Sequence, residues 1–400
     1  MSATRLVRAQ GVTAPEGFRA AGIAAGIKAS GKLDLALVFN EGPDYAAAGV
    51  FTSNQVKAAP VQWSRQVLNS ARLRAVILNS GCANACTGPG GFQDTHATAE
   101  AVAAALSDWG TDTGAVEVAV CSTGLIGDRL PMDKVLAGAA EIVHEMAGGL
   151  VGGDEAARAI MTTDTVPKQV AVHHRDNWTL GGMAKGAGMM APSLATMLVV
   201  LTTDAKVDAA ALDTALRRAT AHTFDRLDID GCCSTNDTVL LLASGASEIT
   251  PSQADLDAAV LQACDDLCAQ LQADAEGVTK RITITVSGAA TEDDALVAAR
   301  LIARDSLVKT ALFGSDPNWG RVLAATGMVP FTIDPDAITV SFNGFAVFTG
   351  GAPQPGAREV DLSGPDVHVT VELNQGSGSA AVRTTDLSHA YVEENSAYSS

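Results

Sequence analysis

The chain has 400 residues, 47% of them hydrophobic, and a formal net charge of −18 at pH 7. This apolar content excludes a mainly disordered chain, and the length favours two domains. Phosphate backbones and anionic membrane surfaces attract clustered Lys and Arg, so the acidic balance argues against nucleic-acid and membrane partners.

Apolar periodicity predicts strands and helices in both halves of the chain. Strands are expected over residues 22–28, 33–40, 46–52, 74–81, 116–124, 168–176, 178–186, 196–204, 238–244, 281–288, 337–348, 367–373 and 379–386. Helices are expected over residues 98–110, 132–146, 209–219, 251–275 and 291–305, the last two with capping-box spacing at their starts. The glycine-rich stretches 87–91 and 148–153 are expected to be turns.

This mixture predicts an α/β protein made of two layered α/β sandwich domains. We place the boundary at 275/276, which gives a larger domain over 1–275 and a smaller one over 276–400.

The N-terminus and the cysteines indicate the compartment. Residues 1–17 contain no apolar signal segment, and the most apolar stretch, 187–201, is too short to cross a membrane. The seven cysteines include no metal-like CxxC pair, and Cys264 and Cys268 lie one helical turn apart within an apolar stripe. We therefore expect a cytoplasmic protein with reduced cysteines and no bound metal.

Familiar catalytic motifs are missing from the sequence. It contains no GxGxxG before a helix, no GxxxxGK[ST], no HExxH and no GxSxG. A different signal is the run CSTGLIG at 121–127, where a strand ends in small residues. The Thr123 hydroxyl and the Gly124 N–H could form an oxyanion hole there. The alternative is a plain turn with a helix cap.

A second signal is Thr196, which stands between a bend of small residues and an apolar run. Attack of its hydroxyl on the Ala195 carbonyl would convert the amide to an ester, and hydrolysis would free the Thr196 amine. An N-terminal threonine carries its own base, which activates its hydroxyl. Alternatively, Thr196 simply opens a buried strand.

Several long blocks, in matching order along nearly the whole chain, resemble the ornithine acetyltransferase family of arginine biosynthesis. These blocks are NSGCANACTG (79–88), CSTGLIG (121–127), MAKGAGMMAPSLATML (183–198), FDRLDIDGCCSTNDT (224–238), DSLVKTALFGSDPNWGR (305–321) and YVEENSAYSS (391–400). The resemblance implies a fold of the N-terminal-nucleophile type that is shared with self-cleaving aminopeptidases. It also implies a cut between Ala195 and Thr196, giving chains 1–195 and 196–400 that pair into an α2β2 heterotetramer.

The resemblance also implies site residues and a reaction. Thr196 is the nucleophile, and Thr123 and Gly124 form the oxyanion hole. The implied substrate-binding positions are Thr162, Lys185, Thr196, Glu276, Asn395 and Ser400. The acetyl group would pass from N2-acetylornithine to glutamate by a ping-pong mechanism, without a metal or organic cofactor. Acetyl-CoA as a further donor stays open, because family members differ.

The residues fit these roles, although simpler interpretations exist. Lys185 can bind an α-carboxylate and Glu276 the side-chain ammonium of acetylornithine. Glu276 could instead be an acid at a helix end, and Asn395 and Ser400 could belong to a frayed tail. Two other functions stay open: a self-cleaving amidohydrolase or aminopeptidase that passes the acyl group to water, and a ligand-binding protein that stays uncut.

Overall fold

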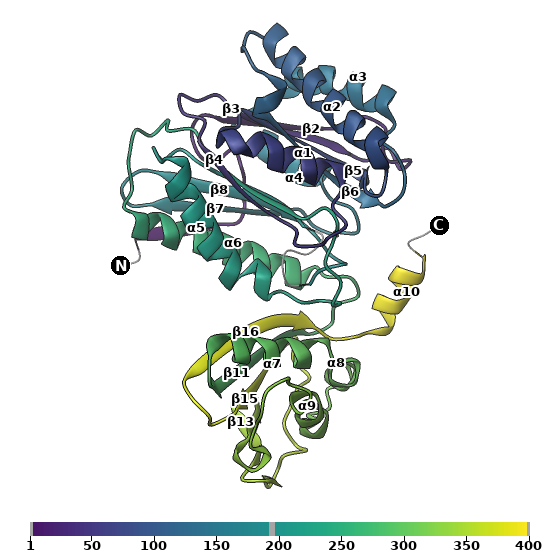
Figure 1. The fold of residues 1–400 in the computed structure, drawn as a ribbon, viewed down its shortest axis with the longest axis vertical. Coiled ribbons are helices and arrows are strands. Elements are labelled where there is room, and N and C mark those ends of the chain that lie inside the picture. Colours follow the sequence, from purple (N-terminus) through teal and green to yellow (C-terminus); the bar gives the residue numbers. More distant parts are fainter. Residues whose placement is uncertain (1–2, 192–196, 398–400) are drawn as a thin grey trace. The chain divides into compact units, whose positions relative to one another are not determined.

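Figure 1 shows the computed structural model, which describes residues 3–191 and 197–397. The described chain forms two compact units. The first contains residues 3–187, 197–225 and 233–271, and the second contains residues 188–191, 226–232 and 272–397. The division at 271/272 lies four residues before the expected boundary at 275/276. Two short segments from earlier in the chain also join the second unit.

The first unit contains two sheets. The larger has the strand order β1-β7-β8-β9-β10-β4, and the smaller has the order β2-β3-β5-β6. The larger sheet consists of β1 (Thr4–Val7), β7 (Lys168–His174), β8 (Thr179–Lys185), β9 (Leu198–Thr203), β10 (Thr238–Ala243) and β4 (Ala47–Phe51). The smaller sheet consists of β2 (Phe18–Ile23), β3 (Leu35–Asn40), β5 (Ala75–Cys82) and β6 (Val118–Leu125). Every residue of β3, β9 and β10 is buried, as the continuous apolar runs in these strands predict.

Helices cover the sheets of the first unit. They are α1 (Ala59–Val67), α2 (Gly88–Asp108), α3 (Met132–Ile142), α4 (Gly149–Ala159), α5 (Ala209–His222) and α6 (Gln253–Ala273). Figure 1 shows α5 and α6 on the side of the larger sheet and α2 and α3 on the side of the smaller one. Side chains from both sheets, among them Phe39, Leu78 and Val200, share one hydrophobic core. The predicted layered α/β class is therefore confirmed.

Both glycine-rich stretches that we expected to be turns lie mainly in helices instead. Gly88 to Gly91 begin α2, and Gly149 to Gly153 begin α4. A Cβ at Gly152 would collide with the carbonyl oxygens of Ala147 and Ala20. Glycine in α4 therefore permits close packing of the helix on β2, and the sequence signal was wrongly assigned to a turn.

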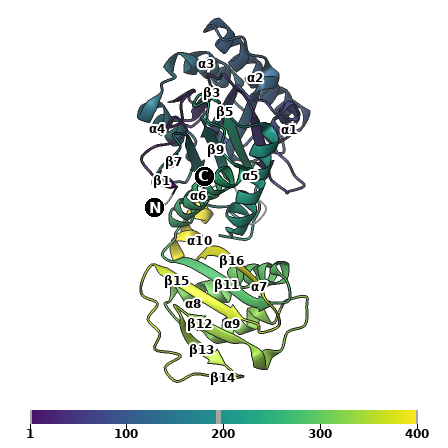
Figure 2. The ribbon, with the colours of Figure 1, turned by 90° about the vertical axis from the view of Figure 1, so that its left-hand side faces the viewer.

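The second unit has one sheet with the order β14-β13-β12-β15-β11-β16. The strands are β11 (Arg281–Ala289), β12 (Thr339–Phe342), β13 (Phe345–Thr349), β14 (Ala352–Pro353), β15 (Asp366–Glu372) and β16 (Gly378–Thr385). The helices are α7 (Glu292–Arg304), α8 (Ser306–Phe313), α9 (Trp319–Thr326) and α10 (His389–Ala397). Buried residues alternate along β11 and β15, and these residues form a core with α7, α8 and α9. Figure 2 shows the strands of this sheet together with the three helices.

Local signals in the helices are also confirmed. The Asp255 N–H donates to Ser252 Oγ at 3.1 Å, and the Asp294 N–H donates to Thr291 Oγ1 at 3.1 Å. Both cysteines of the predicted apolar stripe in α6 are fully buried. Short 3-10 helices cover Leu68–Ser70, Ala115–Glu117, Val143–Glu145, Phe224–Arg226 and Pro335–Ala337. Within the described ranges, no helix is long and apolar enough to cross a membrane.

Candidate active site

Thr123 and Gly124 lie at the end of β6, beside the end of β5. The two strands are parallel, and their register sets Gly124 opposite Gly81. Gly124 has a φ of +130°, and a Cβ there would collide with the Gly81 backbone. Only glycine fits here, so the backbones of β5 and β6 can lie close together directly after Thr123.

A buried lysine contacts the Thr123 hydroxyl. Lys185 is the last residue of β8, and its Nζ donates a hydrogen bond to Thr123 Oγ1 at 3.2 Å. Lys185 is 2% exposed and Thr123 is 1% exposed. Because the Thr123 oxygen accepts this bond, its own proton is available to another oxygen. Within the described part of the chain, no acceptor for that proton is found.

Asp164 connects two predicted substrate positions, and the sequence analysis did not select it. Its fully buried carboxylate accepts from Lys168 Nζ at 2.6 Å, from the Gly186 N–H at 2.7 Å and from the Thr162 N–H at 3.0 Å. Burial opposes ionisation, but the charges of Lys185 and Lys168 and the hydrogen bonds outweigh it and lower the pKa of Asp164 to about 2. Asp164 therefore ties the Thr162 backbone to the residue after Lys185.

A second lysine supports the same region. Lys28 Nζ donates to Met161 O at 2.7 Å and to Leu33 O at 2.9 Å. Burial is the main cause that lowers the pKa of Lys28 to about 8, and the Lys185 charge acts in the same direction. Lys28 thus fixes the carbonyl just before Thr162. The sequence offered only weak signals for these supporting residues, because a single Asp or Lys between apolar segments is usually a surface residue.

Glu276 and Asn395 contact each other in the second unit. Asn395 Nδ2 donates to Glu276 Oε2 at 2.9 Å. The Glu276 carboxylate packs directly on Gly188, where an added Cβ would collide with it. Asn395 lies in α10, so this part of the predicted tail is a helix that contacts Glu276.

Asp230 lies near Glu276 and holds the turn that follows Gly188. It accepts hydrogen bonds from the Met189 N–H at 2.7 Å and the Met190 N–H at 3.0 Å. Burial raises the pKa of Asp230 to about 6, against the effect of these hydrogen bonds, and the Glu276 charge raises it further.

The described chain thus brings the predicted site residues together in two groups. Thr123, Gly124, Thr162 and Lys185 belong to the first unit, and Glu276 and Asn395 belong to the second. Ala195, Thr196 and Ser400 lie outside the described residues. Among the described side chains, no group of three or more His, Cys, Asp or Glu is arranged to hold a metal ion.

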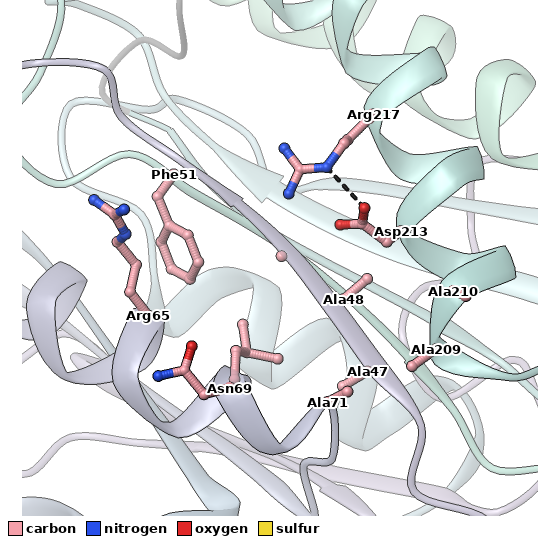
Figure 3. Close-up of a pocket in the computed structure, with 12 residues that line it drawn as sticks. Ala47, Ala48, Phe51, Arg65, Asn69, Ala71, Ala209, Ala210, Asp213 and Arg217 are labelled. Carbon is pink, nitrogen blue, oxygen red and sulfur yellow. Dashed lines mark hydrogen bonds and ion pairs between the residues drawn. The ribbon is translucent and has the colours of Figure 1, made fainter.

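A separate hollow of about 560 Å³ lies along the edge strand β4. Alanine side chains make up much of its lining. Figure 3 shows Arg65 and Phe51 on one side and the ion-paired Asp213 and Arg217 on the other. Arg217 Nε lies 2.8 Å from Asp213 Oδ2. None of the predicted site residues that the structure describes lines this hollow.

A layered α/β protein that buries a lysine against a hydroxyl at a strand end has groups used in acyl-transfer chemistry. The chain belongs to the ArgJ family, whose model matches residues 19–400. The family resemblance expected from the sequence is therefore confirmed.

Relatives and a solved structure match as follows. A Mycobacterium tuberculosis protein called arginine biosynthesis bifunctional protein ArgJ is 82% identical over 99% of this chain and 98% of its own length. The protein of the same name from Streptomyces avermitilis is 59% identical, over 97% of this chain and 100% of its own length. The crystal structure of ornithine acetyltransferase complexed with ornithine from M. tuberculosis is 82% identical, covers 49% of this chain and 100% of its own, and has a TM-score of 0.47.

Proposed function

We propose that this protein is a glutamate N-acetyltransferase that takes its acetyl group from N2-acetylornithine. The chain would first cut itself between Ala195 and Thr196, giving chains 1–195 and 196–400. Family membership over residues 19–400 supports this proposal, as do the relatives named for arginine biosynthesis.

The observation that carries the proposal is the buried hydrogen bond from Lys185 Nζ to Thr123 Oγ1. An ammonium that donates to the hydroxyl oxygen polarises the O–H bond and makes Thr123 a stronger donor. Beside the Gly124 N–H, such a hydroxyl suits the oxyanion of a tetrahedral intermediate.

The proposed reaction has two half-reactions. In the first, Thr196 Oγ attacks the acetyl carbonyl of N2-acetylornithine, while the Thr196 amine takes the hydroxyl proton. The C–N bond then breaks, ornithine leaves with that proton on its amine, and an acetyl ester remains on Thr196. In the second, the glutamate amine attacks the ester carbonyl and gives a proton to the Thr196 amine. The ester C–O bond then breaks, that proton passes to Thr196 Oγ, and N-acetylglutamate leaves.

Substrate recognition in this proposal follows charge. Lys185 binds the α-carboxylate that donor and acceptor share, and Glu276 binds the side-chain ammonium of acetylornithine. Thr162, Asn395 and Ser400 complete the set of substrate-binding residues. No metal or organic cofactor takes part in these steps. The relatives' name, a bifunctional protein, favours a second activity, for which we propose acetyl-CoA as the donor.

We further propose that two copies of each chain form an α2β2 assembly in the cytoplasm. The family resemblance supports the assembly. The lack of disulfides among the described residues fits a reducing compartment.

The test combines intact mass measurement with an assay of ornithine release from N2-acetylornithine. We expect two chains, the second beginning at Thr196, and ornithine release that rises with glutamate concentration. Thr196→Ala should leave one uncut, inactive chain.

Two other outcomes would identify the alternative functions. Equal ornithine release without glutamate would identify an amidohydrolase, and an uncut wild-type chain without transfer would favour a binding protein. A fully cut Thr196→Ala chain would overturn the self-cleavage account. A separate assay of coenzyme A release from acetyl-CoA in the presence of glutamate tests the second donor.

A further inference from the structure

Asp237 fixes the residue that follows Thr196. Its side chain is fully buried, and its Oδ1 accepts the Met197 N–H at 3.0 Å. The carbonyl oxygen of Met197 in turn accepts a hydrogen bond from the Thr238 N–H at 3.2 Å. Met197, directly before β9, is therefore held through both of its backbone groups, and it follows Thr196 in the chain.

The other Asp237 oxygen also faces a donor. Cys233 Sγ donates to Oδ2 at 3.8 Å. No Lys or Arg in the described ranges forms an ion pair with Asp237. Burial raises the pKa of Asp237 well above its ordinary value of 3.8, while the Met197 hydrogen bond and the Lys185 charge oppose this rise. Oδ1 can accept the Met197 N–H whether or not Oδ2 carries a proton, and an amide oxygen in the same place can accept it as well.

Asn236, the residue before Asp237, fixes the backbone beside Thr123. It is 4% exposed, and its Nδ2 donates to Ser122 O at 2.8 Å and to Ala83 O at 2.7 Å. Its Oδ1 accepts from Thr235 Oγ1 at 2.6 Å, so the whole amide is engaged. The Ser122 carbonyl belongs to the peptide bond that leads into Thr123.

Two adjacent side chains thus hold two different parts of the proposed machinery. One fixes the peptide bond after Thr196, and the other fixes the peptide bond before Thr123. Consecutive Cα atoms lie about 3.8 Å apart, so the backbone of residues 236 and 237 links the two peptide bonds over a short path.

We propose that Asn236 and Asp237 are paired positioning residues that set the place of Thr196 relative to the Thr123 and Gly124 oxyanion hole. The inference rests on the proposed function, because it concerns how fast the chain cuts itself and then transfers acetyl groups. A misplacement of about 1 Å in reacting groups can cost ~10²-fold in rate. Loss of either anchor should therefore slow self-cleavage by ~10-fold to ~10²-fold.

Isosteric exchanges at the two positions should have opposite outcomes. Asp237→Asn keeps an oxygen that can accept the Met197 N–H, so it should recover most of the rate lost in Asp237→Ala. Asn236→Asp removes both donors to Ser122 O and Ala83 O while keeping the shape, so it should cleave as slowly as Asn236→Ala. If the two side chains only filled space, both isosteric variants would cleave themselves at the same rate.

Asp204, the residue directly after β9, offers a matched control. It is buried, and it accepts the Thr179 N–H at 2.7 Å and the Glu16 N–H at 3.1 Å. Asp204→Ala therefore also leaves buried backbone donors without their carboxylate, away from Met197. It should lower the melting temperature as Asp237→Ala does, while precursor cleavage continues near the wild-type rate.

The experiment follows full-length precursor made by cell-free synthesis, with uncut and cut chains counted by intact mass over time. Slow cleavage in Asp237→Ala and Asn236→Asp, recovery in Asp237→Asn and normal cleavage in Asp204→Ala would support the pair. Wild-type cleavage rates in Asp237→Ala or Asn236→Asp would overturn it and leave the proposed function intact. An uncut wild-type chain would overturn the proposed maturation, and this inference with it.

Discussion

The residues that support the predicted substrate positions differ between the two units. In the first unit, Asp164 is buried without exposed side-chain area and bonds to Lys168 and to two backbone N–H groups. In the second unit, Glu276 bonds to Asn395, which is exposed on the helix α10. Water can replace a lost partner at an exposed group but not at a buried one. Substitutions in the first group should therefore change stability or catalysis strongly, and those in the second should mainly change substrate affinity.

Asp164→Asn should have the largest effect. It removes the carboxylate that bonds to the buried Lys168 ammonium and to two backbone N–H groups, and removing one partner of a buried pair costs about 3–5 kcal/mol of unfolding free energy. Chemical denaturation at pH 7 measures this loss. The control is Asp213→Asn, which breaks the exposed pair with Arg217 and should cost less than about 1 kcal/mol.

The acid limb of the stability curve sharpens this prediction. The folded-state pKa of Asp164, about 2, lies below its ordinary value of 3.8. The carboxylate's contribution, roughly 2 kcal/mol, is thus fully present above pH ~4 and lost as the pH falls toward ~2. Asp164→Asn should lack this part of the pH dependence. Equal stability losses for the Asp164 and Asp213 variants would contradict the contrast between buried and exposed groups.

Thr123→Ala tests the buried group at the level of chemistry. Loss of one oxyanion donor typically lowers kcat by about 10²–10³-fold, so the variant should transfer acetyl groups slowly with a nearly unchanged KM. Thr123→Ser keeps the hydroxyl beside Lys185 and should recover most of the rate. A wild-type rate in Thr123→Ala would reduce Thr123 to a structural turn residue.

Glu276→Gln should act on the donor more than on the acceptor. A hydrogen bond to a charged group is worth about 1.5–3 kcal/mol, so kcat/KM for acetylornithine should fall by roughly 10- to 150-fold. The value for glutamate should change less, because glutamate carries no side-chain ammonium. Asn395→Ala removes an exposed partner of Glu276. It should lower kcat/KM for acetylornithine by only about 2- to 10-fold. Equal losses for both substrates in Glu276→Gln would refute the ammonium-binding role.

Periodicity predicted the buried strands and long helices of the fold well, since each has one dominant pattern. The predicted helix 251–275 corresponds to α6 (Gln253–Ala273), and the predicted strand 238–244 corresponds to β10 (Thr238–Ala243). α4 was missed, because its glycines read locally as a turn and are explained only by contact with the distant β2.

Site prediction had the same limit. The motif at 121–127 indicated Thr123 and Gly124, because small residues after a strand are a local signal. Asp164, Asn236 and Asp237 carried no such signal, although Asn236 and Asp237 lie within a block that resembles the family. Their importance lies in hydrogen bonds to residues that are distant in sequence or to backbone groups. Only the folded chain reveals such partners.

The strand order of the larger sheet has a consequence for producing the mature protein. β9 and β10 follow residue 196, and they lie between β8 and β4, which precede it. The pairing runs from Lys185 opposite Leu198 to Leu180 opposite Thr203, and β10 pairs with β4 over five residues. A cut at 195/196 would therefore leave two polypeptides whose strands share one sheet. Separating them would require unfolding that sheet with a denaturant. Made separately, each piece would expose unpaired strand edges that favour aggregation, so preparation of the mature enzyme has to start from the uncut chain.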